Sequence, residues 1–238
     1  MDPRDEPPRT IAALALLALG CFGTETGNPP FAPSVAADTG TPMGVVPQLA
    51  VSEGWMAVED VAFEPSERCG AEGVVVRGAP AALALGGGRS LETDPVLDEG
   101  DYCALRFERV AWTSDEPAAL SGATLALDAA LSDRTTVRIR STRTGAVRLA
   151  GEPFRLSEDA GGLLVFADES LLFNGVSFTD ARREPDGSIL VDEATNTDLL
   201  DRVEAQLAGA LFLYRDEDGD GLLSEAERRA GPLAAAAP

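Results

Sequence analysis

Short runs of alternating apolar and polar residues fill the region 50–172 and predict β-strands. The clearest run is Tyr102–Trp112, in which Cys103, Leu105 and Phe107 share one face while charged residues take the other. A period of two residues is that of a strand with one buried face. Clusters of Gly, Pro and Asp separate the runs at short intervals, which favours a mainly β fold, an antiparallel β-sandwich. The predicted strands are Trp55–Phe63, Gly73–Arg77, Ala81–Ala84, Tyr102–Trp112, Ala123–Leu127, Thr135–Arg140, Ala146–Leu149 and Leu163–Phe166.

Beyond the strands, the pattern changes to a helical one. Apolar residues at spacings of three and four, among them Leu200, Val203 and Leu207, predict a helix over Asp198–Tyr214. Gly231-Pro232 ends any further helix after one or two turns. The Ala-rich end of the chain is predicted to fray.

The stretch 216–227 has the residue types and spacing of a calcium loop of the EF-hand type. Such a loop supplies oxygens from positions 1, 3, 5, 7, 9 and 12, and needs Gly at position 6, where Gly221 stands. Leu223 at position 8 is expected to point back into the protein. The alternative is an acidic, solvated turn. The predicted Ca²⁺ ligands are Asp216, Asp218, Asp220, the backbone carbonyl of Leu222, Ser224 and Glu227.

The residues around this loop favour a fixed site. A calcium sensor needs two full helices that open to expose a groove, and only a short helix can follow the loop before Gly231. We therefore expect a structural calcium site that holds the chain in one conformation and does not act as a switch. A degenerate partner loop at Arg182–Glu193 is one reading of the preceding segment, although Arg182 would place a cation at the first ligand position. The other reading is a hairpin turned by Pro185-Asp186-Gly187, with a strand at Ser188–Val191.

The net charge and the absence of two residue types exclude several classes of partner and of catalytic site. The net charge is −21, and such a surface repels nucleic acid and attracts divalent cations. The chain has no histidine, and all 19 basic residues are arginine. No Ser-His-Asp or Cys-His site, His-ligated zinc site or catalytic lysine can be built from it. What remains is carboxylate chemistry, and we predict that the protein is not an enzyme.

The N-terminal region predicts export and lipid anchoring. Two arginines precede an apolar run that is too short to span a bilayer, as in an export signal. The sequence Leu17-Ala18-Leu19-Gly20-Cys21 resembles the lipobox of bacterial lipoproteins. That resemblance implies a signal peptide over 1–20, cleavage before Cys21, acylation of Cys21 and a place on the cell envelope, at the outer membrane or cell surface. The alternative is a plain secretory leader.

Residues 21–48 are rich in Gly, Pro, Ser and Thr, and are predicted to be a disordered tether. This segment contains Asp38-Thr39-Gly40, the short motif of aspartic proteases. Such an enzyme needs two of these loops, whose paired carboxylates share a proton. One copy within a linker does not predict a protease.

Apart from Cys21, the chain has two cysteines, Cys69 and Cys103. In an exported protein, two remaining cysteines are expected to pair, and two free buried thiols are the alternative. The central region resembles a family of uncharacterised secreted bacterial β-sandwich domains, in Gly100-Asp101-Tyr102 and in the later Phe166, Asp168 and Ser170. The resemblance implies a β-sandwich over 49–180, followed at 181–238 by the hairpin, the helix and the calcium loop.

These features together predict a calcium-binding surface lipoprotein with a structural or binding role, whose partner is an envelope protein or a glycan. The alternative is a carbohydrate-binding module, which would need exposed aromatic side chains. Trp55, Trp112, Tyr102 and Tyr214 are the candidates.

Overall fold

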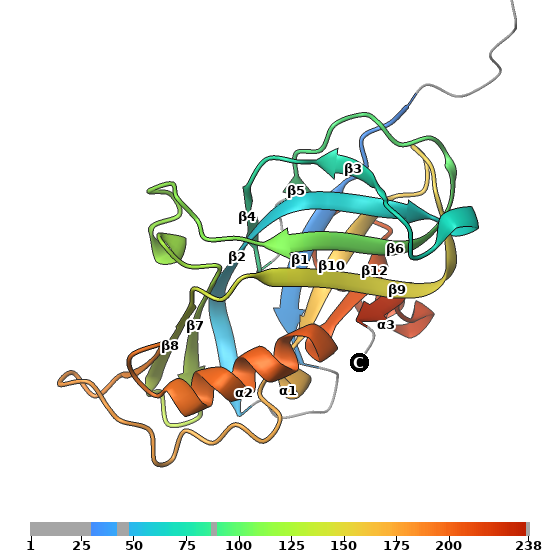
Figure 1. Ribbon diagram of the computed structural model, residues 1–238. Coiled ribbons are helices and arrows are strands. Elements are labelled where there is room, and N and C mark those ends of the chain that lie inside the picture. The colour runs from blue at the N-terminus through green and yellow to red at the C-terminus, as the bar shows by residue number, and fades with distance from the viewer. Residues whose placement is uncertain (1–29, 42–47, 87–89, 237–238) are drawn as a thin grey trace, which may run out of the picture.

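The computed structural model describes residues 30–41, 48–86 and 90–236, and its strands belong to one curled β-sheet (Figure 1). The helices are α1 (Glu169–Leu172), α2 (Thr197–Leu207) and α3 (Glu225–Ala230), with short 3₁₀ turns at 66–68, 118–120 and 208–210. The strands are β1 (Val35–Gly40), β2 (Leu49–Pro65), β3 (Val74–Arg77), β4 (Ala81–Ala84), β5 (Ser90–Leu91), β6 (Gly100–Arg109), β7 (Leu125–Leu131), β8 (Thr136–Ser141), β9 (Gly145–Leu156), β10 (Gly162–Asp168), β11 (Ile189–Val191), β12 (Leu211–Asp216) and β13 (Ala234–Ala236).

The sheet is mixed in direction. Its order is β11-β8-β7-β2-β6-β9-β13-β12-β10-β1-β5, and β3 and β4 also pair with β2. β1 runs parallel to β10, and β11 runs parallel to β8. The prediction of antiparallel strands was therefore wrong, and the predicted β-sandwich is not shown either, because the described strands form one curled sheet. The mainly β class is confirmed. Both parallel pairs join segments far apart in the chain, and no local turn fixes the direction of such a pairing.

Each of the eight predicted strands is present; β4 has the predicted bounds, and the other strands differ from them by up to seven residues at an end. β2 is the most extended, at 17 residues. It pairs first with β7 and then with β6, and its register shifts near Val51, Glu59 and Glu64. Irregularities of this kind bend a strand and increase its twist, and β2 bends between the part that pairs with β7 and the part that pairs with β6 (Figure 1).

One strand lies inside the predicted tether. β1 occupies Val35–Gly40, and Val35, Ala36 and Ala37 are buried where it pairs with β10 and β5. The prediction of disorder over 21–48 was wrong for this part, because the chain there is ordered by partners more than 50 residues away. Residues 21–29 and 42–47 lie outside the described part of the chain.

The helix predicted over Asp198–Tyr214 is also too long. α2 ends at Leu207, and Leu211–Asp216 forms β12, between β10 and β13. The tail predicted to fray instead supplies β13 (Ala234–Ala236), which bridges β12 and β9. The small residues there permit close contact, because a Cβ on Gly151 of β9 would lie 2.1 Å from the Leu233 carbonyl oxygen.

The region 182–193 forms the predicted hairpin turn. The Glu184 amide donates to the Ser188 carbonyl at 2.8 Å, and Ile189 begins β11. The carboxylate of Asp186 accepts from Ser188, whereas Glu193 accepts from Thr142 at the end of β8. The two acidic residues are thus committed to different partners, which does not support a second calcium loop.

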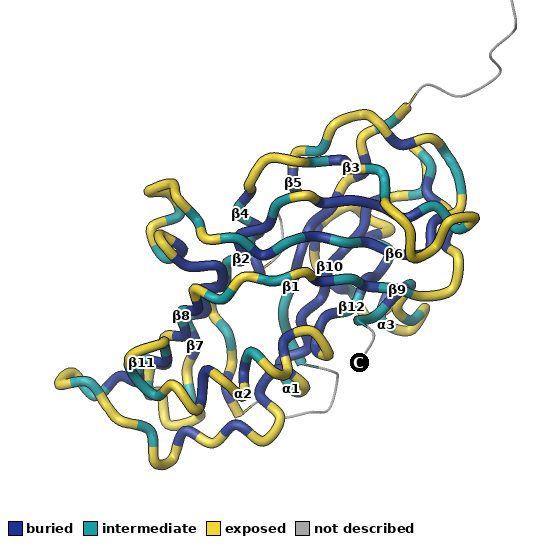
Figure 2. Tube along the Cα trace, viewed as in Figure 1, coloured by how far each residue is buried: buried dark blue, intermediate teal, exposed yellow. Residues whose placement is uncertain are grey.

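Alternation along the strands gives the sheet a large inner core and a smaller outer one. The inner core receives Leu163 and Val165 from β10 and Leu213 from β12, together with the buried face of α2. Figure 2 shows these strands as mostly buried. The outer cluster lies on the opposite face of β1, β10 and β12, and consists of Ala36, Leu164, Phe166, Tyr214 and Leu223, with Phe212 packed against it.

Candidate metal centre

β12 delivers the first acidic residue of the 216–227 loop to the outer face of the sheet. Phe212 and Tyr214 alternate with inward-facing leucines and belong to the outer cluster, and Asp216 follows them two residues later. The loop therefore continues directly from a strand, where the sequence predicted a helix. It ends at α3, for which Ser224 is the N-cap.

Three predicted ligands converge. One carboxylate oxygen from each of Asp216, Asp218 and Glu227 lies within 4.8 Å of the others. Asp216 is only 1% exposed and Glu227 3% exposed, whereas Asp218 faces solvent. The donor set is made of oxygen alone, which suits a hard divalent cation. These residues fit such an ion.

Backbone amides hold the two buried carboxylates in place. The Asp216 carboxylate accepts hydrogen bonds from the backbone amides of Gly219 at 2.9 Å and Gly221 at 3.1 Å. Glu227 accepts from the amides of Glu217 at 2.7 Å and Ser224 at 2.8 Å, so its side chain joins the two ends of the loop. A carboxylate offers about four lone-pair sites, which leaves acceptor capacity on both groups.

The backbone at Gly221 has the conformation for which the loop needs glycine. Gly221 has a φ of 72°, a left-handed conformation that residues with a Cβ rarely adopt. Gly219 has a φ of 73° and makes a second such turn within the loop. The choice of glycine at position 6 is therefore explained by the backbone.

Burial opposes ionisation of Asp216. It raises the pKa of that carboxyl above its usual value, and the nearby Glu227 and Asp218 raise the pKa further, against the lowering effect of the Gly221 and Gly219 amides. Like charges brought together in a partly buried place favour a proton or a cation between them. The arrangement can bind a cation to relieve this repulsion.

The other predicted ligands lie less centrally. Asp220 accepts from the Leu222 amide at 2.8 Å, and its carboxylate is outside the converging group. Leu222 is 44% exposed, and the ligand predicted from it is the backbone carbonyl. The Ser224 hydroxyl accepts from the Glu227 amide at 3.3 Å and, with the Glu227 side chain, completes a capping box for α3.

The loop and α3 are packed onto the sheet. Leu223 lies in the outer cluster, as its position in the loop predicted, and Phe166 and Tyr214 meet edge to face beneath it. The Arg228 guanidinium of α3 lies 4.9 Å from the centre of the Phe166 ring. Contacts of this kind fix the loop on a rigid surface.

Two kinds of residue at this site were not identified from the sequence. Gly161 and Gly162 make room for the loop, since a Cβ on Gly161 would lie 2.7 Å from the Asp216 carbonyl oxygen. A glycine pair at a strand end is the sequence signal for such a close approach. The other residue that was not identified is Asp38. Its carboxylate accepts a hydrogen bond from the backbone amide of Leu223, which lies 185 positions later in the sequence.

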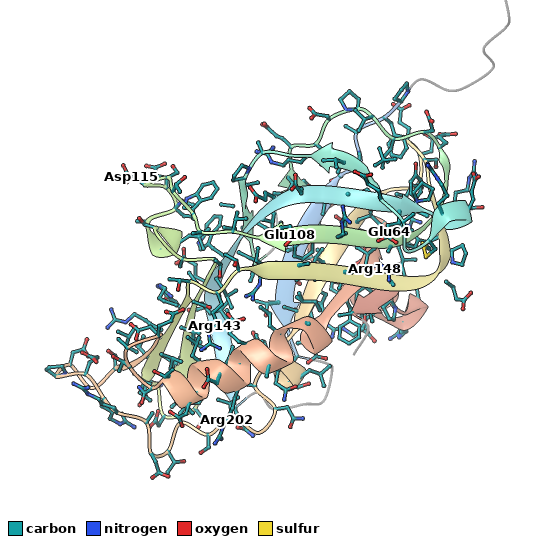
Figure 3. All side chains as sticks on the ribbon, viewed as in Figure 1. Glu64, Glu108, Asp115, Arg143, Arg148 and Arg202 are labelled. Carbon is teal, nitrogen blue, oxygen red and sulfur yellow. A yellow bond between two sulfur atoms is a disulfide. The ribbon has the colours of Figure 1, made fainter. Side chains whose placement is uncertain are left out.

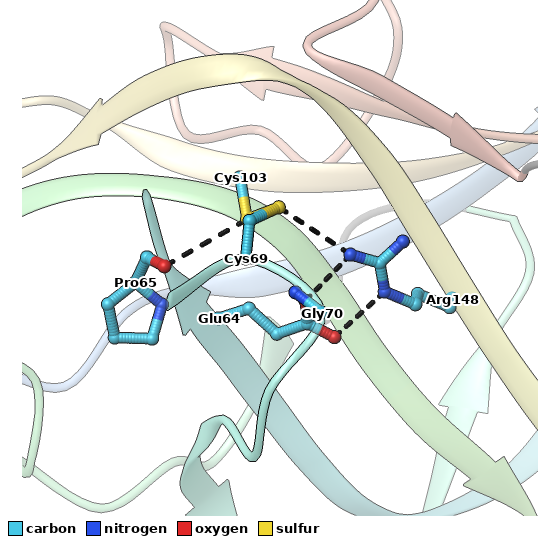
Figure 4. The surroundings of a disulfide bond; sticks show 6 residues. All are labelled: Glu64, Pro65, Cys69, Gly70, Cys103 and Arg148. Carbon is cyan, nitrogen blue, oxygen red and sulfur yellow. Dashed lines mark hydrogen bonds and ion pairs between the residues drawn. A yellow bond between two sulfur atoms is a disulfide. The ribbon is translucent and has the colours of Figure 1, made fainter. Parts of the chain in front are cut away.

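A second group, Glu64 with Cys69 and Cys103, lies at the far end of β2 (Figure 4). The predicted disulfide Cys69–Cys103 is present there, so its sulfurs are not free thiolates. Glu64 is 2% exposed and forms a two-point ion pair with Arg148 of β9, at 2.8 and 2.7 Å. Figure 3 shows Glu64 of β2 and Arg148 of β9 close together, on strands that are separated in the sheet by β6. This group is structural.

The predicted lipidation residue Cys21 lies outside the described residues. Within them, none of the helices has the length and apolar character needed to cross a bilayer. Comparisons with protein-family models, with curated proteins and with solved structures found no match.

Proposed function

We propose that the protein is a calcium-binding lipoprotein of the bacterial cell envelope, with a structural or binding role and no enzymatic activity. The observation that carries the calcium proposal is the convergence of Asp216, Asp218 and Glu227 within a loop of matching spacing. In this proposal Asp220, the Leu222 carbonyl and Ser224 complete the oxygen ligands. Calcium neutralises the repulsion among the carboxylates and joins β12 to α3.

Calcium affinity in this setting is expected to be modest. Extracellular sites bind with dissociation constants of about 10⁻⁴ to 10⁻³ M, near the calcium concentration outside cells. At one to ten times the dissociation constant, mass action stabilises the folded protein by about 0.4–1.4 kcal/mol. For a domain of this size that corresponds to a rise in Tm of about 1–5 °C.

A thermal melt in EDTA and in millimolar Ca²⁺ tests this proposal. We expect the calcium-dependent rise in Tm in the wild type, and its loss in both Asp216→Ala and Glu227→Ala. The matched control is Glu217→Ala, which removes an exposed carboxylate from the same loop and should keep the rise. An equal Tm in EDTA and Ca²⁺ for the wild type would reject the calcium site.

The anchoring part of the proposal rests on Cys21. Acylation of Cys21 with more than one fatty acyl chain would hold the protein stably at a membrane. Cys21→Ser should move the protein from the membrane fraction to the soluble fraction of the producing bacterium. Equal membrane association of the wild type and the variant would contradict the lipid anchor.

Two observations support a non-enzymatic role. The chain has no histidine or lysine. The Asp-Thr-Gly motif lies on β1, where the two oxygens of Asp38 accept from the Thr39 and Leu223 amides. The neighbouring Glu169 accepts from the Val51 amide at 3.1 Å. Because these carboxylates accept hydrogen bonds from backbone amides, they favour a role in holding the strands together over a role in proton transfer.

A carbohydrate-binding role is the second candidate. Tyr102 and Tyr214 are buried and unsuited to it, but Trp55 and Trp112 are half-buried against one small cluster formed by Ala57, Leu120, Ala123 and Ala126. Two partly exposed indole rings that pack against the same cluster could contribute to stacking on a sugar. Binding to a glycan array that is lost in both Trp55→Ala and Trp112→Ala would favour this candidate, and silence on the array would reject it.

A further inference from the structure

Asp38 connects strand β1 to the loop that follows β12. Its Oδ2 accepts a hydrogen bond from the Leu223 amide at 3.1 Å, and its Oδ1 accepts one from the Thr39 amide at 2.8 Å. β1 is itself paired along its whole length with β10, where Asp38 lies opposite Phe166. The carboxylate is therefore held by the sheet, and the loop docks onto it.

The Leu223 amide belongs to the same peptide group as the Leu222 carbonyl, the predicted ligand at position 7. That peptide is trans, since the cis bond found among the described residues is Glu116–Pro117. In a planar trans peptide the N–H and the C=O point in opposite directions. A hydrogen bond to Asp38 thus fixes the Leu222 carbonyl oxygen so that it points away from Asp38.

The charge of Asp38 adds to this geometric effect. A hydrogen bond to an anionic acceptor is stronger than one to a neutral acceptor, and it polarises the peptide group. Polarisation places more negative charge on the carbonyl oxygen at the other end. The Leu222 oxygen becomes a better ligand for a hard cation.

Other contacts hold the same two segments together. Leu223 belongs to the same outer cluster as Ala36 of β1. Arg228 of α3 donates a hydrogen bond to the Thr41 carbonyl, just after β1, at 3.5 Å. The loop is thus fixed to β1 on both sides of Asp38. A fixed acceptor can set the orientation of the peptide before any ion arrives.

We propose that Asp38 is a positioning residue of the calcium site, which orients and polarises the Leu222 carbonyl from outside the ligand shell. The inference rests on the proposed calcium function and adds to it a residue from the opposite end of the chain. In this proposal a well-ordered β1 strengthens calcium binding, and bound calcium in turn stabilises the ordered β1.

The test is calcium affinity measured by calorimetry for the wild type, Asp38→Asn and Glu217→Gln. Asn keeps the size of the side chain, but has one oxygen for two amide donors, and its NH₂ group would face the other donor. Loss of an outer positioning group is expected to weaken binding about 10-fold. Glu217→Gln removes the same charge from an exposed place and should weaken binding much less.

Hydrogen exchange of the Leu223 amide gives a second readout. It should be slow in the wild type, even in EDTA, and faster in Asp38→Asn. If Asp38→Asn does not fold, the exchange rate of the Leu223 amide in the wild type decides the question. Rapid exchange there would show that the hydrogen bond to Asp38 is absent and would overturn the inference. Equal calcium affinities of the two variants would overturn the role of Asp38 and leave the calcium site standing. A wild type that does not bind calcium would overturn both.

Discussion

Asp216 and Gly162 face each other across β12 and β10, and the missing side chain of Gly162 leaves the space that the Asp216 carboxylate occupies. A Cβ built on Gly162 would lie 3.3 Å from Oδ2 of Asp216. That distance is tighter than ordinary van der Waals contact, so the carboxylate would have to move by a few tenths of an ångström.

Gly162→Ala is therefore expected to weaken calcium binding by about 10-fold while leaving the fold intact, because ligands placed by packing tolerate little displacement. Calorimetry with Ca²⁺ and a melt in EDTA measure the two effects separately. Gly161→Ala is the contrasting variant, since Gly161 has a φ of 77° and a Cβ there would meet the Asp216 carbonyl. It should lower the free energy of unfolding in EDTA by about 1–2 kcal/mol or more. Unchanged affinity in Gly162→Ala would contradict the packing argument.

Glu169 is expected to limit stability at neutral pH. It is 6% exposed, and its burial raises the pKa of the carboxyl above 4.5, with Asp168 and Asp38 raising it further. Because the pKa is higher in the folded state, ionisation costs stability as the pH rises through the folded pKa, and costs nothing below the unfolded pKa. Glu169→Gln keeps an oxygen acceptor for the Val51 amide and removes the charge.

We therefore expect Glu169→Gln to raise Tm at pH 7, and the gain to disappear as the pH falls below about 4.5. Glu152→Gln, on the exposed side of β9, is the matched control and should change Tm little at either pH. A Tm gain that is the same at pH 4 and pH 7 would show that the charge of Glu169 is not the cause.

Arg148 is expected to stabilise the fold through Glu64. The hydrogen bond from Arg148 is the largest cause of a lowered pKa at Glu64, and the Gly70 amide donates to the same carboxylate at 2.7 Å. Arg148→Met would leave a buried carboxylate with the amide alone. We expect a loss of about 2–3 kcal/mol in the free energy of unfolding at pH 7.

The pH dependence of this loss follows from the depressed pKa. The contribution of Glu64 is present above the unfolded pKa and is lost as the pH falls through the folded pKa, so the difference between wild type and variant should shrink in acid. The double variant Glu64→Gln with Arg148→Met should recover part of the stability. Denaturant unfolding at pH 7 that gives equal values for wild type and Arg148→Met would contradict this account.

Local patterns in the sequence identified most of the strands and the acidic loop. Both depend on residues close together in the chain: a period of two residues for the strands, and fixed spacings within twelve residues for Asp216–Glu227. The disulfide was likewise predictable, because the N-terminal residues predict export, and the two cysteines other than Cys21 then have one pairing to make.

The remaining features depend on contacts between distant segments. β12 has apolar residues on both faces, Leu211 and Leu213 inward and Phe212 and Tyr214 outward, so its pattern shows no period of two and extends the apparent helix. β1 is short and lies in a Pro- and Gly-rich region, and is ordered by β10. The contact of Asp38 with the loop has no local signal at all.

A calcium titration of the wild type and Glu227→Gln by calorimetry tests the central claim most directly. Glu227 supplies the closing carboxylate and joins the two ends of the loop through the amides of Glu217 and Ser224. We predict one calcium ion per wild-type chain, with a dissociation constant of about 10⁻⁴ to 10⁻³ M, and binding at least 10-fold weaker in Glu227→Gln. No heat of binding from the wild type at millimolar Ca²⁺, or equal affinities of the two proteins, would contradict the calcium site.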